Sequence, residues 1–325
     1  EAFAAECKKA ADAFRDYGAV AVRDPRVCFD DNETFLSMME RYFEMSDGER
    51  DARPEVHYQV GVTPNGVERA RLIALCLQDH CARFGSYGPD DQPLSPCPPD
   101  YDPKWRFFWR IGPKPESTLF PSLNAAQVIP PEIPEWTDVM DMWGNKMLDA
   151  VYTLSTMTAV GFDLPEDAFT SKMVGGPHLL APTGSDFNKY GIECEPGRVL
   201  AGLHYDLNFL TIHGKSRFPG LFVWTRSGKK MAVKVPDGCL LVQAGKQFEI
   251  LMGGHVQAGF HEVAVTQATR AVIDRRQAAG ESLWRVSSTL FSHIMSDNAL
   301  EPLGKYATEE AVAAYPRVLA GKQVK

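Results

Sequence analysis

The sequence predicts a protein of mixed α and β class, with a largely helical front part packed against an antiparallel β-sandwich or barrel. Up to about residue 180 the apolar residues recur at helical spacing, and Pro-rich turns separate these stretches. From about residue 185 short β-branched or apolar runs alternate with turn residues, which is typical of an antiparallel β fold. Neither a GxGxxG nor a P-loop motif is present, so a doubly wound nucleotide-binding sheet has no support.

The front part begins with a helix, a turn and a strand. Residues 3–14 carry apolar side chains every three or four positions, and the alternating run at 19–22 predicts a short strand. Residues 33–43 and 67–84 predict two further helices. Residues 85–103 are dense in Pro, Gly and Asp, so they predict an irregular surface connection.

A strand and the longest predicted helix lead into the β half. The aromatic run at 105–111 predicts the strand, and the apolar periodicity at 136–161 predicts the helix. The strands predicted beyond it lie at 207–212, 220–224, 231–235, 239–242, 261–265 and 286–291. A helix at 308–319 is expected to close the chain.

The composition argues against several classes of function. The chain has 325 residues, a net charge of -8 and no basic run that would neutralise a phosphate backbone, so nucleic acid is not an expected partner. No apolar stretch approaches the roughly 20 residues needed to cross a bilayer, so no membrane partner is expected. The seven cysteines are scattered without a CxxC pair, which favours free thiols in a reducing, cytoplasmic compartment. We expect a monomer that acts on a small molecule.

His204 and Asp206 form an HxD pair at the edge of a predicted strand. Residues i and i+2 of a strand point to the same face, so an imidazole and a carboxylate at this spacing can bind one metal ion. By itself the pair is a weak signal, because an exposed strand pair has the same pattern. His261 opens a later strand and is the expected third ligand; two histidines and one carboxylate form the facial triad suited to non-haem Fe(II) and oxygen.

The other histidines fit the third position less well. His255 follows a Gly-Gly turn and His213 follows a strand, and neither opens a run that would be fixed inside a barrel. Three more are expected at the surface or in structural hydrogen bonds: His57, His80 and His178.

Two further motifs carry groups that suit a small dicarboxylic acid. Arg285 and Ser287 share one strand face, where the guanidinium can bind a carboxylate through two parallel hydrogen bonds and the hydroxyl adds a donor. Asn188 and Tyr190 could donate to the same acid from another strand. A lone RxS is weak, and a polar turn is the simpler interpretation of the second motif when it is taken alone.

In combination these motifs resemble the isopenicillin N synthase-like branch of the iron(II) and 2-oxoglutarate-dependent oxygenases. The run at 204–212 is similar to the family's HTDxGxLTLL, and 218–223 to its GGLQV strand. Residues 240–261 resemble the segment that ends in the family's second histidine ligand. In front, 14–22 and 42–50 resemble two segments of the family's N-terminal cap, so the resemblance extends over essentially the whole chain.

The resemblance implies a distorted jelly-roll, the cupin-like double-stranded β-helix, with helices packed outside. The parts expected within this single structural unit are an N-terminal cap at 1–115, connecting helices at 116–180, the double-stranded β-helix core at 181–295 and a C-terminal helix at 296–325.

The resemblance also implies the cofactors and the residues that bind them. Fe(II) bound by His204, Asp206 and His261 would keep three positions for 2-oxoglutarate and O2, and no other residue is expected to be catalytic. The presence of Asp206 argues against a halogenase. The expected 2-oxoglutarate ligands are Arg285 and Ser287 at its C5 carboxylate, with Asn188 and Tyr190 near its C1 end.

The implied activity is oxidation of an unactivated C–H bond of a small molecule, with release of succinate and CO2. The outcome would be hydroxylation, desaturation or oxidative ring closure, in specialised amino-acid-derived metabolism. Two alternatives stay open: a non-haem iron oxidase that needs no 2-oxoglutarate, and a non-enzymatic jelly-roll module that holds a metal. The residues expected at the substrate are Arg110, Phe108, Phe291 and His293.

The chain departs from the family pattern at several positions. Arg285 lies 24 residues after His261, farther than is usual, so residues 267–283 would form an inserted charged loop or helix. Arg270 lies nearer the usual number of residues after His261, but no serine follows it two positions later. It is the alternative anchor, that is, the alternative arginine to bind the C5 carboxylate of 2-oxoglutarate. The family's usual residue types are also replaced at Glu262, Lys246 and His293, so a different charge around the metal is expected.

Overall fold

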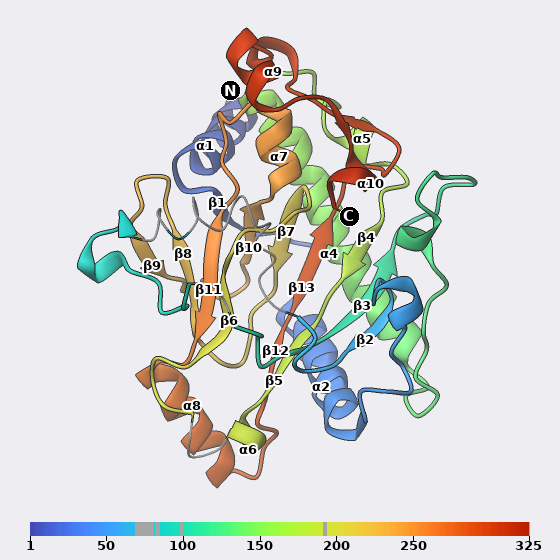
Figure 1. Cartoon of the computed structure of the whole chain (residues 1–325), viewed down its shortest axis with the longest axis vertical. Helices are drawn as coiled ribbons and strands as arrows, with labels where there is room; N and C mark the ends of the chain where they lie inside the picture. Colours follow the sequence, from blue (N-terminus) through green and yellow to red (C-terminus); the bar gives the residue numbers. More distant parts are fainter. Residues whose placement is uncertain (69–80, 82–84, 98–99, 191–193, 325) are drawn as a thin grey trace.

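The computed structural model describes residues 1–68, 81, 85–97, 100–190 and 194–324 (Figure 1). Within this part of the chain, two curved antiparallel sheets form the core of the molecule and helices lie outside them. The predicted class, a mixed α and β distorted jelly-roll, is confirmed. The predicted helix at 67–84 falls almost wholly outside the described residues, and His80 lies outside them as well.

The larger sheet has the strand order β1-β10-β7-β13-β4-β3-β5-β12, with β2 paired to β3. Its strands are β1 (Ala19–Val22), β2 (Gly61–Thr63), β3 (Trp105–Ile111), β4 (His178–Leu180), β5 (Thr183–Asp186), β7 (Leu210–His213), β10 (Leu240–Ala244), β12 (Trp284–Ser287) and β13 (Thr289–Ser292). Three of these, β1, β2 and β3, come from the front part, so residues before 115 build the sheet as well as cover it.

The smaller sheet has the order β6-β11-β8-β9. Its strands are β6 (Val199–His204), β8 (Leu221–Trp224), β9 (Lys230–Ala232) and β11 (Phe260–Ala264). A separate pair joins β14 (Ala299–Leu300) to β15 (Val318–Leu319). Among the described strands β6 pairs only with β11, so the other edge of β6 needs hydrogen-bond partners from outside the sheet.

The helices flank the sheets and connect their strands. The α-helices are α1 (Ala2–Tyr17), α2 (Phe29–Met45), α4 (Trp136–Gly161), α5 (Thr170–Met173), α6 (Phe187–Tyr190), α7 (Lys246–Leu251), α8 (Gln267–Ala278), α9 (Glu309–Ala314) and α10 (Ala320–Gln323). The short 3-10 turns are η1 (Pro54–Val56), η2 (Pro89–Asp91), η3 (Pro121–Asn124) and η5 (Gly304–Tyr306).

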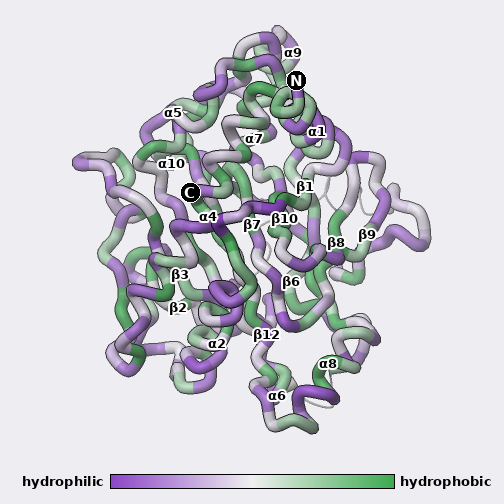
Figure 2. The backbone as a smooth tube through the Cα atoms, turned by 180° about the vertical axis from the view of Figure 1, so that it is seen from behind, coloured by the Kyte–Doolittle hydropathy of each residue, from purple (hydrophilic) through white to green (hydrophobic). Residues whose placement is uncertain are grey.

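Helix α4, the long helix predicted at 136–161, lies at the centre of the hydrophobic core. It packs on α1, α2 and the strands β3, β4, β7 and β13 of the larger sheet. Figure 2 shows hydrophobic residues along α4 and hydrophilic residues in the outlying segments near β9. Helices α1 and α4 approach closely at Gly161, where a Cβ would lie 2.1 Å from the carbonyl oxygen of Cys7, so only glycine fits there.

Several predicted segments differ from the structure in extent; the strand predicted at 286–291, for example, is two strands, β12 and β13. The helix predicted at 308–319 is α9, which ends at Ala314 because Pro316 cannot continue it; the chain then pairs as β15 and ends in the short helix α10. The insertion predicted at 267–283 is a helix, α8, over Gln267–Ala278, and Thr266 caps its first turn by accepting from the Thr269 N–H.

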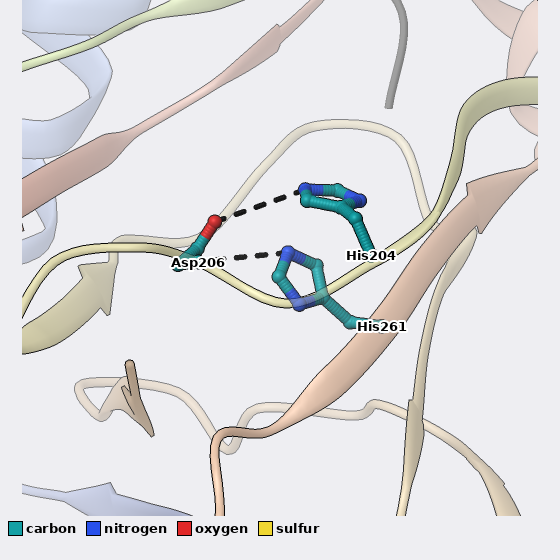
Figure 3. Close-up of side chains that lie close together, drawn as sticks. All are labelled: His204, Asp206 and His261. Atoms are coloured by element: carbon teal, nitrogen blue, oxygen red, sulfur yellow. Dashed lines mark ion pairs between the residues drawn. The ribbon is translucent and has the colours of Figure 1, made fainter. Parts of the chain in front are cut away.

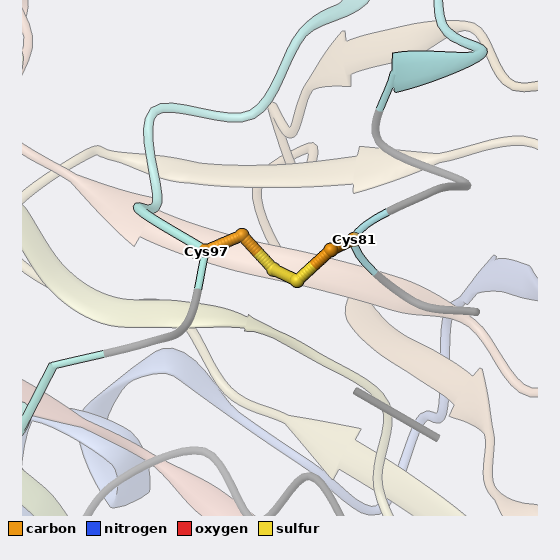
Figure 4. Close-up of a disulfide and its surroundings, with 2 residues drawn as sticks. All are labelled: Cys81 and Cys97. Atoms are coloured by element: carbon orange, nitrogen blue, oxygen red, sulfur yellow. A yellow bond between two sulfur atoms is a disulfide. The ribbon is translucent and has the colours of Figure 1, made fainter. Parts of the chain in front are cut away.

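The prediction of free thiols is wrong for one pair of cysteines. Cys81 and Cys97 form a disulfide with a Cα–Cα distance of 5.8 Å, within the range that a disulfide spans (Figure 4). Sequence spacing without a CxxC pair did not reveal the pair, because the fold brings the two residues together. The described free cysteines are Cys7, Cys28, Cys194 and Cys239.

None of the described helices combines the length and the apolar character that crossing a membrane requires.

Candidate metal centre

Three residues predicted as metal ligands converge between the two sheets. His204 ends β6 and His261 lies directly opposite it on β11, with ring centroids 4.2 Å apart. Asp206 lies in the connection from β6 to β7, which crosses from the smaller sheet to the larger. The three ligand atoms lie within 4.8 Å of one another (Figure 3), and no other such group of His, Cys, Asp or Glu is found among the described residues.

Backbone carbonyls set the tautomer of both histidines. Nδ1 of His204 lies 2.6 Å from the Gly202 carbonyl oxygen, and Nδ1 of His261 lies 3.2 Å from that of Gly259. Each Nδ1 therefore carries the proton and donates, which leaves the Nε2 lone pair for a metal ion. Nε2 of His204 lies 3.7 Å from Oδ1 of Asp206, and Nε2 of His261 lies 3.9 Å from Oδ2.

The charge state of the group also suits a cation. Burial, together with His261, lowers the pKa of His204 to about 4, so the ring is neutral at pH 7. Burial opposes ionisation of Asp206, but the two histidines and a hydrogen bond from Thr211 hold the pKa of this carboxyl below its usual range. The Thr211 hydroxyl donates to Oδ2 of Asp206 at 2.6 Å. Two imidazoles and one carboxylate are a donor set that fits Fe(II).

Arg285 and Ser287 lie on the face of β12 that points away from the main core. The residues that alternate with them, Trp284 and Val286, belong to the core. Arg285 is only 7% exposed, and its guanidinium has no hydrogen bond or ion pair within the described residues. Burial lowers the pKa of Arg285 to about 10, so it still carries a charge at pH 7. A buried, unpaired guanidinium is the structural feature expected at an anion site.

Arg270, the alternative anchor, has a different environment. It lies on α8, and its guanidinium donates to Asp274 at 2.6 Å, one turn further along the same helix. Arg270 is thus bound to a carboxylate of its own helix.

The Asn188 and Tyr190 motif is on a helix, α6, and not on a strand as expected. Asp186 starts this turn, since its Oδ1 accepts from the backbone N–H groups of Asn188 and Lys189. The side chain of Asn188 is exposed, whereas Arg285 and the histidine–aspartate group are buried. The assignment of Asn188 to 2-oxoglutarate stays a prediction, and the side chain of Tyr190 lies outside the described part of the chain.

Two of the residues expected at the substrate do meet. The rings of Phe108 on β3 and Phe291 on β13 pack edge to face, with centroids 6.4 Å apart. Leu179 and Ala181 complete this apolar cluster, and the Arg106 guanidinium lies 4.6 Å from the centre of the Phe108 ring. Thr211 faces Phe291 across the strand pair, so the cluster lies beside the residue that holds Asp206.

The remaining substrate candidates differ in what they contact. Arg110 is buried, and it donates to the carbonyls of Gly112, Pro113, Gly175 and Gly176 and to Oδ1 of Asn124. Its guanidinium therefore holds loops together. Nδ1 of His293 is buried without a partner in the described part of the chain. Burial lowers the pKa of His293 to about 4, and the charge of Asp206 opposes this shift.

The unusual Glu262 and Lys246 are both paired. Glu262 is fully buried and accepts from the backbone N–H groups of Leu94 and Ser95, the Ser95 hydroxyl and Lys230. Lys246 forms an ion pair with Glu249.

The sequence did not indicate four residues that contact residues in or beside the site. They are Thr211 at Asp206, Thr289 at Ser287, Gln243 at His213 and Arg106 at Phe108. A signal existed, because Thr211 and His213 alternate along β7 with the core residues Leu210 and Ile212.

The part of the chain that contains this centre matches a known protein family. The family model described as "2OG-Fe(II) oxygenase superfamily" matches residues 186–294, which include all three predicted metal ligands and the Arg285 motif. The resemblance expected from the sequence is thus confirmed. A curated Arabidopsis thaliana protein, "Probable inactive 2-oxoglutarate-dependent dioxygenase AOP2", is 30% identical over 96 residues, which span 30% of this chain and 22% of that protein.

Solved structures extend the likeness of the fold to the whole chain. A "putative 2OG-Fe(II) oxygenase family protein" from Caulobacter crescentus superimposes with a TM-score of 0.75, 20% identity and coverage of 99% of this chain and 92% of that one. A full-length Neurospora crassa protein in complex with alpha-KG gives a TM-score of 0.70 at 16% identity, with 99% and 89% covered. Arabidopsis thaliana DAO1, a dioxygenase for auxin oxidation, gives 0.59 at 16% identity, with 94% of both chains covered.

Proposed function

We propose that this chain, which belongs to the 2-oxoglutarate and Fe(II)-dependent oxygenase superfamily through its residues 186–294, oxidises a C–H bond of a small molecule. The family uses Fe(II), 2-oxoglutarate and O2, and the family match with the fold indicates a 2-oxoglutarate-dependent dioxygenase. When bound, the iron and 2-oxoglutarate would supply the oxidising power, with release of succinate and CO2.

The unpaired guanidinium of Arg285 is the observation that carries the proposal. A charge left buried without a partner is strongly unfavourable, so a ligand anion is the expected counter-charge. Ser287 lies on the same strand face and adds a hydroxyl beside the guanidinium. We assign both residues to the C5 carboxylate of 2-oxoglutarate, and His204, Asp206 and His261 to Fe(II).

The apolar cluster of Phe108, Leu179, Ala181 and Phe291 is the surface that we assign to the substrate. An aromatic wall of this kind excludes water and orients an apolar molecule, because C–H groups pack on ring faces and edges. His293, with its unpartnered Nδ1, would add one polar contact. Arg110 is left out of the proposed site because backbone carbonyls occupy its guanidinium.

The test is an anaerobic spectroscopic titration of the Fe(II) protein with 2-oxoglutarate. The wild type should develop a weak visible charge-transfer band, His261→Ala should lose it, and Arg285→Met should need at least about tenfold more 2-oxoglutarate, since a bidentate charged contact is lost. Arg270→Met is the matched control, because this arginine is bound to Asp274, and it should titrate like the wild type.

Other outcomes would contradict the proposal in different ways. Bound iron without any band in the wild type would favour the oxidase that needs no 2-oxoglutarate. A wild type that binds no iron would favour a non-enzymatic module. An effect of Arg270→Met equal to that of Arg285→Met would reject the assigned anchor.

A further inference from the structure

A series of partly buried hydrogen bonds, here called the relay, leads from Ser287 of the proposed carboxylate site through Thr289 to His213 and Gln243. Ser287 and Thr289 follow each other on the inward face of β12 and β13, and His213 ends the neighbouring strand β7 opposite Thr289. The Thr289 hydroxyl lies 3.2 Å from Oγ of Ser287 and 3.0 Å from Nδ1 of His213. Nε2 of His213 lies 2.9 Å from the side-chain amide of Gln243 on β10.

The number of hydrogens on Ser287, Thr289 and His213 assigns a donor and an acceptor to each hydrogen bond of the relay. Oγ of Ser287 accepts from the Thr183 N–H at 3.1 Å and from the Thr289 hydroxyl, which fills both of its lone pairs. The one hydrogen of Ser287 is then left for a ligand. The Thr289 hydroxyl donates its one hydrogen to Ser287, so its oxygen can only accept from His213. The proton of the imidazole is therefore on Nδ1.

Gln243 completes the assignment at the other end. A neutral imidazole with its proton on Nδ1 has an acceptor at Nε2, and this atom needs a donor. The amide nitrogen of Gln243 is buried and has no partner within the described residues, while its oxygen faces His213. A half-turn of this amide exchanges the two atoms and gives Nε2 of His213 its donor.

We propose that His213 is a positioning residue for the anion that Arg285 and Ser287 bind: it holds Thr289, and through Thr289 it directs the Ser287 hydrogen at the carboxylate. This inference rests on the proposed function, which assigns that anion as the distal carboxylate of 2-oxoglutarate. The acceptor sites of Ser287 are filled before the ligand arrives, so the hydroxyl needs no reorientation on binding.

The experiment measures the dissociation constants of 2-oxoglutarate and of Fe(II) by anaerobic calorimetry on the Fe(II) protein and the apoprotein. His213→Leu and Thr289→Val should each weaken 2-oxoglutarate binding about tenfold, the effect of misdirecting one hydrogen bond to a charged group. The affinity for Fe(II) should stay within about twofold, because the relay does not include the metal ligands.

Two further variants distinguish positioning from a structural role. His213→Asn keeps an N–H donor near Nδ1 and should restore most of the 2-oxoglutarate affinity. In a Ser287→Ala background His213→Leu should add less than about twofold, because the hydroxyl through which it acts is already gone. Thr158→Val removes a buried hydroxyl of α4, bonded to the Leu154 carbonyl, and should leave 2-oxoglutarate affinity unchanged.

The outcomes separate the two proposals. If His213→Leu costs the same factor with and without Ser287, the relay is wrong while the anchor stands. If Ser287→Ala has no effect on 2-oxoglutarate, the relay and the assignment of Ser287 both fail. If the wild type binds Fe(II) but not 2-oxoglutarate, the proposed function fails, and the relay with it.

Discussion

Thr211 shows how one side chain can orient a metal ligand. Its hydroxyl donates to Oδ2 of Asp206 at 2.6 Å, and both residues are buried. Hydrogen bonds of this kind hold a carboxylate in the geometry that the metal requires. The bond also joins the smaller sheet to the larger, since Asp206 follows β6 and Thr211 belongs to β7.

Thr211→Val should therefore weaken the affinity for Fe(II) about tenfold, because the carboxylate loses its fixed orientation. Metal competition with a chromophoric chelator measures this constant. Thr158→Val, the same change in α4, should not alter it. An unchanged constant in Thr211→Val would show that Asp206 is held by other contacts.

The burial of His178 predicts that the free energy of unfolding falls at acid pH. It is 1% exposed, and burial lowers its pKa to about 3 from a reference of 6.5, so the folded state binds the proton less well than the unfolded state. The stabilisation is fully present above pH 6.5 and is lost as the pH falls towards 3. Within this window one such group changes the free energy of unfolding by about 1.4 kcal/mol per pH unit.

His178→Gln should make the free energy of unfolding fall less steeply, by roughly 1 kcal/mol between about pH 6 and pH 5. Urea unfolding at several pH values measures the slope. His57→Gln, a change at an exposed histidine, should keep the slope of the wild type. Equal slopes in His178→Gln and the wild type would contradict the assigned burial effect.

At the scale of elements, Glu262 ties the segment around Ser95 to the smaller sheet. Its carboxylate accepts from Leu94, Ser95 and Lys230, and the Ser95 hydroxyl in turn accepts from the N–H of Leu203 on the open edge of β6. Asp102 accepts from Gly202 on the same edge. Side chains of the connection before β3 thus supply the partners that this edge strand lacks.

Glu262→Gln should destabilise the protein by about 3 kcal/mol, because Lys230 is left largely buried without its partner. Chemical unfolding gives the value, and limited proteolysis should cleave the segment at 85–97 faster. The double variant Glu262→Gln, Lys230→Met should recover part of the loss, since no unpaired charge remains. No recovery would mean that the backbone contacts, and not the charge pair, dominate.

At the scale of the whole molecule, the disulfide between Cys81 and Cys97 closes a loop with a sequence separation of 16. A cross-link over a loop of this length stabilises a fold by about 3 kcal/mol, chiefly by restricting the unfolded chain. Cys97→Ser should lower the free energy of unfolding by about that amount under non-reducing conditions. Cys239→Ser, at a free cysteine, should have little effect.

A reducing agent provides the complementary measurement. It should lower the stability of the wild type to that of Cys97→Ser and should leave Cys97→Ser itself unchanged. A wild type that is insensitive to reduction would contradict the pairing. The predicted reducing compartment stays a prediction.

The local alternation of side chains in a strand paired His204 with Asp206 and Arg285 with Ser287 on one face each. The structure brings His204, Asp206 and His261 together, as the sequence predicts. The choice of His261 and of Arg285 over the other candidates also needed the resemblance to the family, and the roles of Arg285 and Ser287 stay predictions. The long helix at 136–161 was equally clear, because its apolar periodicity is a local property.

Other features depend on how distant strands align, and only the tertiary structure decided them. His213 meets Thr289 and Gln243 because β7 pairs with β13 on one side and with β10 on the other. Likewise, Arg285 is unpaired within the described residues while Arg110 is saturated, a difference that follows from which carbonyls and carboxylates the fold brings to each guanidinium. Residue types and spacing specify what a side chain can bond to, whereas the register between segments far apart in sequence specifies what it does bond to.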